Sequence, residues 1–227
     1  MVKRHKSHVV GISKLIMPAD RKLIFDFLRE RADEGQVAAV RDLVMLEVLM
    51  GSGIREAELC GLRVMDTPVV LGGDCIEIIK GAKGGRRRVV WIDDELSKLV
   101  VWYVKEIRQG TLPRHVRRGD ITRAVFYSAD KRPYKTVGVY WKVRRIGQKA
   151  GVKKRLTPHM FRHSYATYAL SAKGDGSNLK MVQQQLGHSN IATTEKYLHL
   201  IQSLVQPAAN AMGLKAREAG LMLHLQR

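Results

Sequence analysis

"QVAAVRDLVMLEVLMGSG", residues 36–53, is apolar on almost every side when it is wound as a helix. A surface helix keeps a polar face, so a helix of this composition belongs in the interior. Gly51 and Gly53 then favour its end, because glycine weakens a helix interior and adopts the conformation that closes a helix. The sequence therefore predicts a central buried helix with other elements packed around it.

Helices and one small sheet are predicted around this segment. Residues 17–35 predict an amphipathic helix with Asp20 as its cap, and residues 54–62 predict a short helical continuation. The β-branched stretches 75–81 and 86–93 flank a glycine-containing turn and predict two strands, with 124–128 as a third. A helix is expected between the second and third strands, over residues 94–110.

The rest of the chain is expected to be helical. Its predicted helices cover residues 134–151, 157–174, 178–187, 189–205 and 208–225. The fold class is therefore mainly α with a small antiparallel β-sheet (α+β). No Pro- or Gly-rich linker divides the chain. We expect a loose basic arm over residues 1–17, one domain over 18–205 and a C-terminal helix over 206–227.

The charge balance predicts a polyanionic partner. Forty Lys and Arg face twenty-one Asp and Glu, which gives a net charge of +19 and a pI near 10.2. Nucleic acid is the first candidate and an anionic membrane surface the second. No apolar run approaches the roughly 18 residues of a membrane span, and the start lacks the apolar stretch of a secretory signal. Two cysteines without a CxxC pair fit a reducing cytosol.

A histidine and a tyrosine stand nine residues apart in "LGHSNIATTEKY", residues 186–197. Nine residues turn a helix by about 900°, so His188 and Tyr197 cannot share one helix face. Gly187 ends one helix, which leaves His188 in a connecting turn and Tyr197 about two turns into the next helix. They could converge on a bound molecule, although a helical tyrosine is more often a packing residue.

A His-x-x-Arg pair opens the helix predicted for "TPHMFRHSYAT", residues 157–167. His159 and Arg162 lie three apart, on one face at a helix start, where a phosphate or carboxylate can bind. A plain surface pair is the alternative. His163 is expected to point elsewhere and to pack or hydrogen-bond internally. In "GSGIREAEL", Arg55 follows a glycine break, and Glu58 is its expected partner, in a solvated salt bridge or a site.

Basic residues follow the central turn of the predicted sheet. Lys83 lies at the tip of the hairpin, and Arg86, Arg87 and Arg88 come next. They could protect a strand edge or contact phosphates. A metal site is not expected, since no HExxH, EF-hand loop or cysteine pair is present. Further DNA contacts are expected from a basic stretch that includes Lys142, Arg144, Arg145, Lys153, Lys154 and Arg155.

The order of these motifs resembles the tyrosine recombinase (integrase) family, over about residues 18–200. The resemblance is carried by Arg55, Lys83, His159, Arg162, His188 and Tyr197. It implies that Tyr197 attacks a DNA phosphate and forms a 3′-phosphotyrosine link. Arg55 and Arg162 would grip the phosphate oxygens, and His188 would add a hydrogen bond. His159 would act as the general base, Lys83 as the acid at the leaving 5′ oxygen, and Glu58 would orient Arg55.

The resemblance also implies the setting of the reaction. No metal or nucleotide cofactor is expected. The partners would be double-stranded DNA and three further copies in a tetramer that makes a Holliday junction, with a DNA-bending protein as a candidate accessory partner. The cytoplasm is the expected compartment. Most relatives carry a DNA-clamping domain before the catalytic one, and this chain has only about seventeen residues there. Rival interpretations are a type IB topoisomerase and a non-catalytic DNA-binding protein on the same fold.

Overall fold

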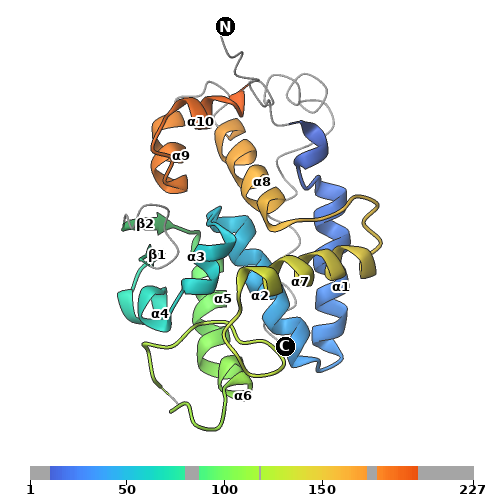
Figure 1. The fold of residues 1–227 in the computed structure, drawn as a ribbon, viewed down its shortest axis with the longest axis vertical. Coiled ribbons are helices and arrows are strands. Elements are labelled where there is room, and N and C mark those ends of the chain that lie inside the picture. Colours follow the sequence, from blue (N-terminus) through green and yellow to red (C-terminus); the bar gives the residue numbers. More distant parts are fainter. Residues whose placement is uncertain (1–10, 80–86, 118, 173–177, 199–227) are drawn as a thin grey trace, which may run out of the picture.

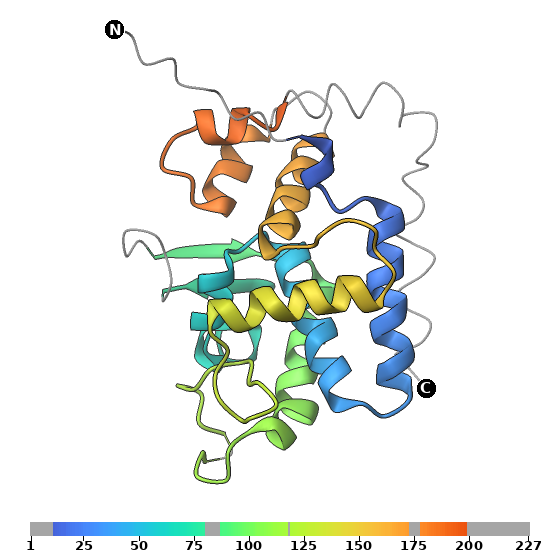
Figure 2. The same cartoon turned by 45° about the vertical axis from the view of Figure 1, so that its right-hand side comes forward.

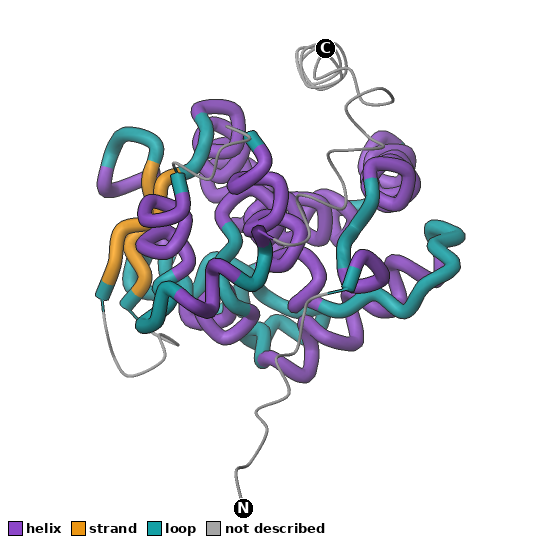
Figure 3. The backbone as a smooth tube through the Cα atoms, turned by 90° about the horizontal axis from the view of Figure 1, so that it is seen from above, coloured by secondary structure: helices purple, strands orange, loops and turns teal. Residues whose placement is uncertain are grey.

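A computed structural model describes residues 11–79, 87–117, 119–172 and 178–198 of the chain. Within these ranges the fold is mostly helical, with a single two-stranded antiparallel sheet. Figure 3 shows the two strands at one edge of the helical body. The helices are α1 (Pro18–Asp33), α2 (Val37–Ser52), α3 (Glu56–Gly61), α4 (Pro68–Leu71), α5 (Asp94–Trp102), α6 (Arg108–Thr111), α7 (Thr136–Lys149), α8 (Pro158–Ser171), α9 (Leu179–Leu186) and α10 (Ala192–Glu195). The strands are β1 (Cys75–Ile78) and β2 (Arg88–Trp91), and 3-10 turns cover Ile12–Lys14 and Val64–Asp66.

The predicted central helix is α2. It packs against α1, α5 and α8, and its apolar side chains from Val44 to Leu49 are fully buried (Figure 1). Two of its buried charged residues pair with each other: Arg41 donates to Asp42, and the second Asp42 oxygen lies 3.1 Å from Lys142 of α7. This ion pair fastens α7, which crosses beside α2 (Figure 2). Burial of a charge is tolerated because each group has an opposite partner.

Gly53 closes α2 in a way that no other residue could. Its φ is +66°, and an added Cβ would lie 2.4 Å from a ring carbon of Tyr165. Backbone in the left-handed region favours glycine, and the contact leaves no space for a side chain. The glycine break predicted from sequence therefore lets α8 approach the end of α2, where Arg55 begins α3.

A smaller apolar cluster lies at one end of the molecule. Figures 1 and 2 place α8, α9 and α10 together there, and α9 contacts β2. The cluster is formed by Ala166, Leu170, Val182, Leu186 and Tyr197. It joins α8 to α9 and to the turn that follows α10, so it is packed separately from the main core around α2.

Several sequence predictions differ from the structure. Residues 124–128 do not form a third strand; they make only isolated bridges, because their backbone bonds go to loop residues on both sides. The helix predicted over residues 189–205 is interrupted in its described part: α10 spans four residues, and a turn covers residues 196–197. Met17, not Asp20, is the N-cap of α1, and Asp20 accepts a hydrogen bond from the Met17 amide instead.

The predicted boundary of the N-terminal arm also differs. Leu15 and Ile16 are fully buried, and the Ile16 amide donates to Ser164 Oγ at 2.7 Å. Residues 11–17 thus pack onto α8 and are not loose. Residues 1–10 and the predicted C-terminal helix lie outside the described residues. In the part of the chain that is described, no helix is long and apolar enough to cross a membrane.

Candidate functional site

Arg162 lies at the centre of the candidate site. It lies just over one turn after Pro158, the first residue of α8, and it is only 5% exposed. Nη1 donates to the Gly53 carbonyl and Nη2 to the Leu186 carbonyl, both at 2.7 Å. These bonds use two of the five N–H donors of the guanidinium, so further donors are available for an anion. Burial, and then repulsion by Arg55, lowers the pKa of Arg162 to about 9.

Glu58 holds two more arginines beside Arg162. Its carboxylate is fully buried and accepts from Arg55 Nη1 at 3.0 Å and from the Arg55 amide at 2.7 Å. Arg88 donates two parallel bonds to the same carboxylate, each of 2.8 Å. Burial opposes ionisation of Glu58, but the bonds from Arg88 and from the Arg55 backbone outweigh it and hold its pKa below the usual value. The predicted Arg55–Glu58 pair is therefore present, and it is buried rather than solvated.

Arg88 also fixes the sheet to α9. Its Nε donates to the Gln185 carbonyl at 3.0 Å, and the Gln185 side chain pairs with both backbone groups of Trp91. Gly187 makes room for this contact: its φ is +66°, and an added Cβ would lie 3.0 Å from Arg88 Nε. The hairpin, α3 and α9 are thus joined at one point next to Arg162.

His188 occupies the turn after Gly187, as the sequence predicts. Its Nδ1 lies 2.9 Å from the Thr194 hydroxyl, which orients the ring. Burial, followed by repulsion from Arg162, Arg55 and Arg88, lowers the pKa of His188 to about 3. The ring is therefore neutral at physiological pH, and it lies close enough to all three arginines to feel their charge.

Tyr197 lies in the turn after α10 and is only 4% exposed. Its ring packs in the apolar cluster of α8 and α9, and its hydroxyl lies 2.7 Å from Nδ1 of His163. Burial raises the pKa of Tyr197, whereas Arg162 and Arg55 act to lower it. The tyrosine is therefore near the arginines, although it is not two turns into a helix.

The structure corrects the interpretation of the two histidines of α8. His163 forms an internal hydrogen bond, as expected, but it does not point away from the site, because its partner is the Tyr197 hydroxyl. His159 is exposed, and its ring centroid lies 5.5 Å from that of His163. The spacing carries the missed signal: residues 159 and 163 are four apart, so a helix places them on the same face.

Comparison with known proteins identifies the fold and the family. The family model described as the phage integrase family matches residues 14–203. The chain belongs to the phage integrase family. Tyrosine recombinase XerD of Staphylococcus aureus strain N315 is 32% identical over 183 residues, which are 81% of this chain and 58% of the relative. XerD of Staphylococcus haemolyticus is 30% identical over 183 residues, again 81% of this chain and 58% of the relative.

Solved structures of integrase-family proteins have the same fold. The crystal structure of XerA recombinase matches with a TM-score of 0.66 and 25% identity, over 92% of this chain and 66% of that chain. XerH site-specific recombinase bound to a palindromic difH substrate, a post-cleavage complex, matches with a TM-score of 0.64 and 20% identity. The match covers 88% of this chain and 54% of that chain. The chain spans less than two thirds of the curated relatives that it matches.

The structure divides the predicted DNA-binding residues of this integrase-family chain. Lys83 and Arg86 lie outside the described residues. Three others are engaged within the protein: Arg88 with Glu58, Lys142 with Asp42, and Lys154 with Asp20 and the Leu15 carbonyl. Arg144 is half-buried and lies over the Trp141 ring. The exposed members are Arg87, Arg145, Lys153 and Arg155, the last bound to the Tyr140 hydroxyl.

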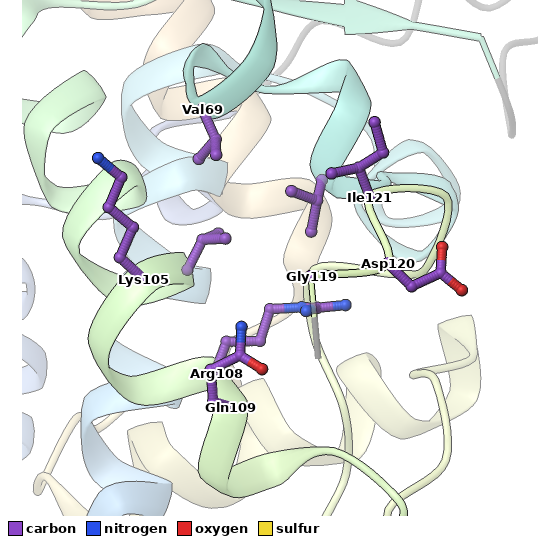
Figure 4. A pocket seen from close by; sticks show the side chains of 9 residues that line it. Val69, Lys105, Arg108, Gln109, Gly119, Asp120 and Ile121 are labelled. Atoms are coloured by element: carbon purple, nitrogen blue, oxygen red, sulfur yellow. The ribbon is translucent and has the colours of Figure 1, made fainter. Parts of the chain in front are cut away.

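A cavity at the opposite end of the molecule is separate from this cluster. It has a volume of about 180 Å³ and is lined by Val64, by Val69 of α4, by residues 104–109 of the helical segment that follows α5, and by the loop 119–121 (Figure 4). None of the candidate residues lines it. A small-molecule ligand needs such an enclosed space, whereas DNA binds an open cationic surface, so the arginine cluster remains the candidate site. In the described ranges, no group of three or more His, Cys, Asp or Glu is arranged to hold a metal.

Glu58→Gln is expected to destabilise the fold by about 3 kcal/mol, the usual cost of breaking a buried ion pair. The amide would leave Arg55 and Arg88 with one weak acceptor in place of a charged, bidentate one. Urea unfolding measures the change in free energy. Glu30→Gln, at an exposed position of α1, is the matched control. Equal stability of both variants would contradict a structural role for the Glu58 charge.

Proposed function

We propose that this chain cuts and rejoins DNA strands through a covalent bond between Tyr197 and a DNA phosphate. One observation carries the proposal: Arg55, Arg162, His188 and Tyr197 come from distant parts of the chain and meet in a single cationic cluster. Clustered guanidiniums suit a phosphodiester, because each donates paired hydrogen bonds to its oxygens. The similarity to the XerD recombinases supports the same reaction.

The proposed reaction balances without an external energy source. The Tyr197 oxygen attacks phosphorus, a phosphotyrosine bond forms, and the bond to the 5′ oxygen breaks. The phenol proton passes to His159, and Lys83 protonates the departing 5′ oxygen. Arg55 and Arg162 stabilise the charge on the non-bridging oxygens, His188 adds a hydrogen bond, and Glu58 orients Arg55. A 5′ hydroxyl from another strand then attacks the phosphotyrosine and releases Tyr197.

The proposed setting is site-specific recombination of double-stranded DNA. Four copies would exchange strands through a Holliday junction, with residues 206–227 docking on a neighbouring copy. A DNA-bending protein is the candidate accessory partner. The reaction would take place in the cytoplasm, where bacterial chromosomes lie. It would need neither metal nor nucleotide cofactor, since the phosphotyrosine keeps the energy of the broken bond.

Trapping of the covalent intermediate tests this proposal. The protein is incubated with a library of randomised duplexes, each with a nick. When the nick lies just beyond the cut, the short fragment that carries the freed 5′ hydroxyl diffuses away, and rejoining is prevented. DNA that stays with the protein after denaturation in SDS carries the phosphotyrosine bond. Adduct formation supports the enzyme, whereas DNA binding without adduct would indicate a DNA-binding protein that does not cut.

The DNA sequence recovered with the protein from the library is then used to distinguish recombination from strand relaxation. A plasmid with two copies of the site is incubated with the protein. Recombinant circles are the expected product. Relaxed plasmid without recombinants would instead indicate a topoisomerase.

DNA affinity is expected to fall steeply with salt. Each phosphate contact releases a condensed counterion, so four contacts lower the affinity by roughly 100-fold between about 50 and 200 mM salt. Arg87, Arg145, Lys153 and Arg155 are the exposed cations from which we expect these contacts. Fluorescence anisotropy over a salt series measures the slope. Replacement of both Arg145 and Lys153 by alanine should reduce the slope of log affinity against log salt concentration by about 2, the value for two lost phosphate contacts. An affinity that does not change with salt would contradict binding through phosphates.

A further inference from the structure

The hydroxyl of Tyr197 has a defined partner on α8. It lies 2.7 Å from Nδ1 of His163, and the two ring centroids are 5.7 Å apart. The two residues are 34 positions apart in the chain, so this is a tertiary contact and not a local turn. Tyr197 is almost completely buried, so water does not compete freely for its hydroxyl.

The charge states of both groups decide which one donates. Burial, and then His159, Lys14 and Arg162, lowers the pKa of His163 to about 4, so its ring is neutral at physiological pH. Burial raises the pKa of Tyr197, so the phenol keeps its proton. A neutral imidazole has one nitrogen that accepts and one that donates. In the tautomer that carries its proton on Nε2, the phenol donates to Nδ1 of His163, and this is the tautomer on which the inference rests.

The anchor of the phenol is rigidly linked to the phosphate-binding arginine. His163 and Arg162 are consecutive residues of α8, and both Arg162 Nη groups are fixed by the carbonyls of Gly53 and Leu186. Tyr197 itself lies in a turn after a helix of only four residues, so its position is set by tertiary contacts: the apolar cluster holds the ring and His163 holds the hydroxyl. The bond to His163 therefore fixes the phenol relative to α8, the helix that carries Arg162.

We infer that His163 is a positioning residue for the proposed strand cleavage, because its Nδ1 holds the Tyr197 phenol at a fixed place beside Arg162. The inference rests on the proposed function. His163 is not the final proton acceptor: an imidazolium there would face Arg162, Lys14, His159 and His188. His163 acts through Tyr197 and need not touch the DNA. The exposed His159, one turn earlier, keeps the proposed role of base.

Removal of the acceptor tests the inference. In His163→Leu, the single-turnover rate of adduct formation should fall by about 10- to 100-fold, because a displacement of about 1 Å costs that much at a reacting atom. DNA affinity should stay within about threefold, since no phosphate contact is lost. His163→Asn should recover most of the rate, because its amide oxygen can take the place of Nδ1. His115→Leu, at an exposed loop position, is the matched control and should react like the unmodified protein.

Two further measurements separate positioning from proton transfer and from mere stability. The pH–rate profile of His163→Asn should keep its shape between about pH 6 and 9, because a neutral acceptor adds no titration there. Loss of the acidic limb would overturn positioning in favour of a base. In the free protein, the ¹⁵N shift of His163 Nδ1 should move in Tyr197→Phe, and an unchanged shift would overturn the contact.

The outcomes for the unmodified protein distinguish the two proposals. If it forms adduct and His163→Leu forms it equally fast, the inference about His163 is wrong and the proposed function stands. If the unmodified protein forms no adduct on any duplex of the library, the proposed function fails and the inference fails with it. A slow His163→Leu variant that Asn does not rescue would also overturn the inference, since it would indicate a packing role only.

Discussion

Tyr197→Phe is expected to abolish covalent adduct formation completely. The substitution removes one oxygen, which is the proposed nucleophile, and leaves the ring that packs between α8 and α9. The fold should survive, because only the hydrogen bond to His163 is lost, at a cost of about 1 kcal/mol. DNA affinity should stay within a few fold, since the phenol is not one of the cations that hold phosphates.

Denaturing gels measure the adduct, and a mobility shift measures affinity for the same nicked duplex. Tyr168→Phe is the matched control: it removes a half-buried phenol on α8 whose hydroxyl donates to the Ile16 carbonyl at 2.8 Å. This control should lose similar stability and keep full cleavage. An adduct that persists in Tyr197→Phe would show that another group attacks the phosphate, and it would end the assignment of Tyr197.

Much of the helical framework is predictable, because burial is encoded in residue order. The apolar composition of residues 36–53 predicts α2, and the glycines at its end predict the break before Arg55. The hairpin strands follow from β-branched residues around a glycine turn, although residues 80–86 of that turn lie outside the described residues. Residues 124–128 have the same composition as a strand and form none, because β-propensity depends on whether a partner strand is available.

The candidate site is predictable only where its contacts are local. Arg55 and Glu58 are three residues apart, so helix geometry alone predicts their pairing. Arg88 lies 30 residues from Glu58, and its two bonds to that carboxylate depend on how the sheet packs against α3. The contact of His163 with Tyr197 depends on the packing of α8 and on a turn after α10. Sequence periodicity carries no information about such distant pairs, so both contacts required the structure.

Arg162→Ala is expected to slow cleavage by roughly 10²- to 10³-fold, the usual cost of losing one donor to a transition-state oxygen. The guanidinium bridges Gly53 and Leu186, so its loss removes both the phosphate donor and the link between α2 and α9. Two buried carbonyls would then lack a donor, which should lower stability by about 1–3 kcal/mol. Rates must therefore be compared below the unfolding transition of each variant.

A second substitution separates the charge of Arg162 from its geometry. Arg162→Lys keeps a cation and can reach one carbonyl, but an ammonium cannot donate two parallel bonds to a phosphate, so a large loss of rate should remain. Arg108→Lys is the matched control, because Arg108 is only 1% exposed and lies away from the site. Its Nε and Nη2 both donate hydrogen bonds to the Ala124 carbonyl. This variant should lose stability and keep its cleavage rate. If a folded Arg162→Ala variant cleaves within tenfold of the unmodified protein, the guanidinium does not contact the reacting phosphate. The cationic cluster would then only hold α2, α8 and α9 together.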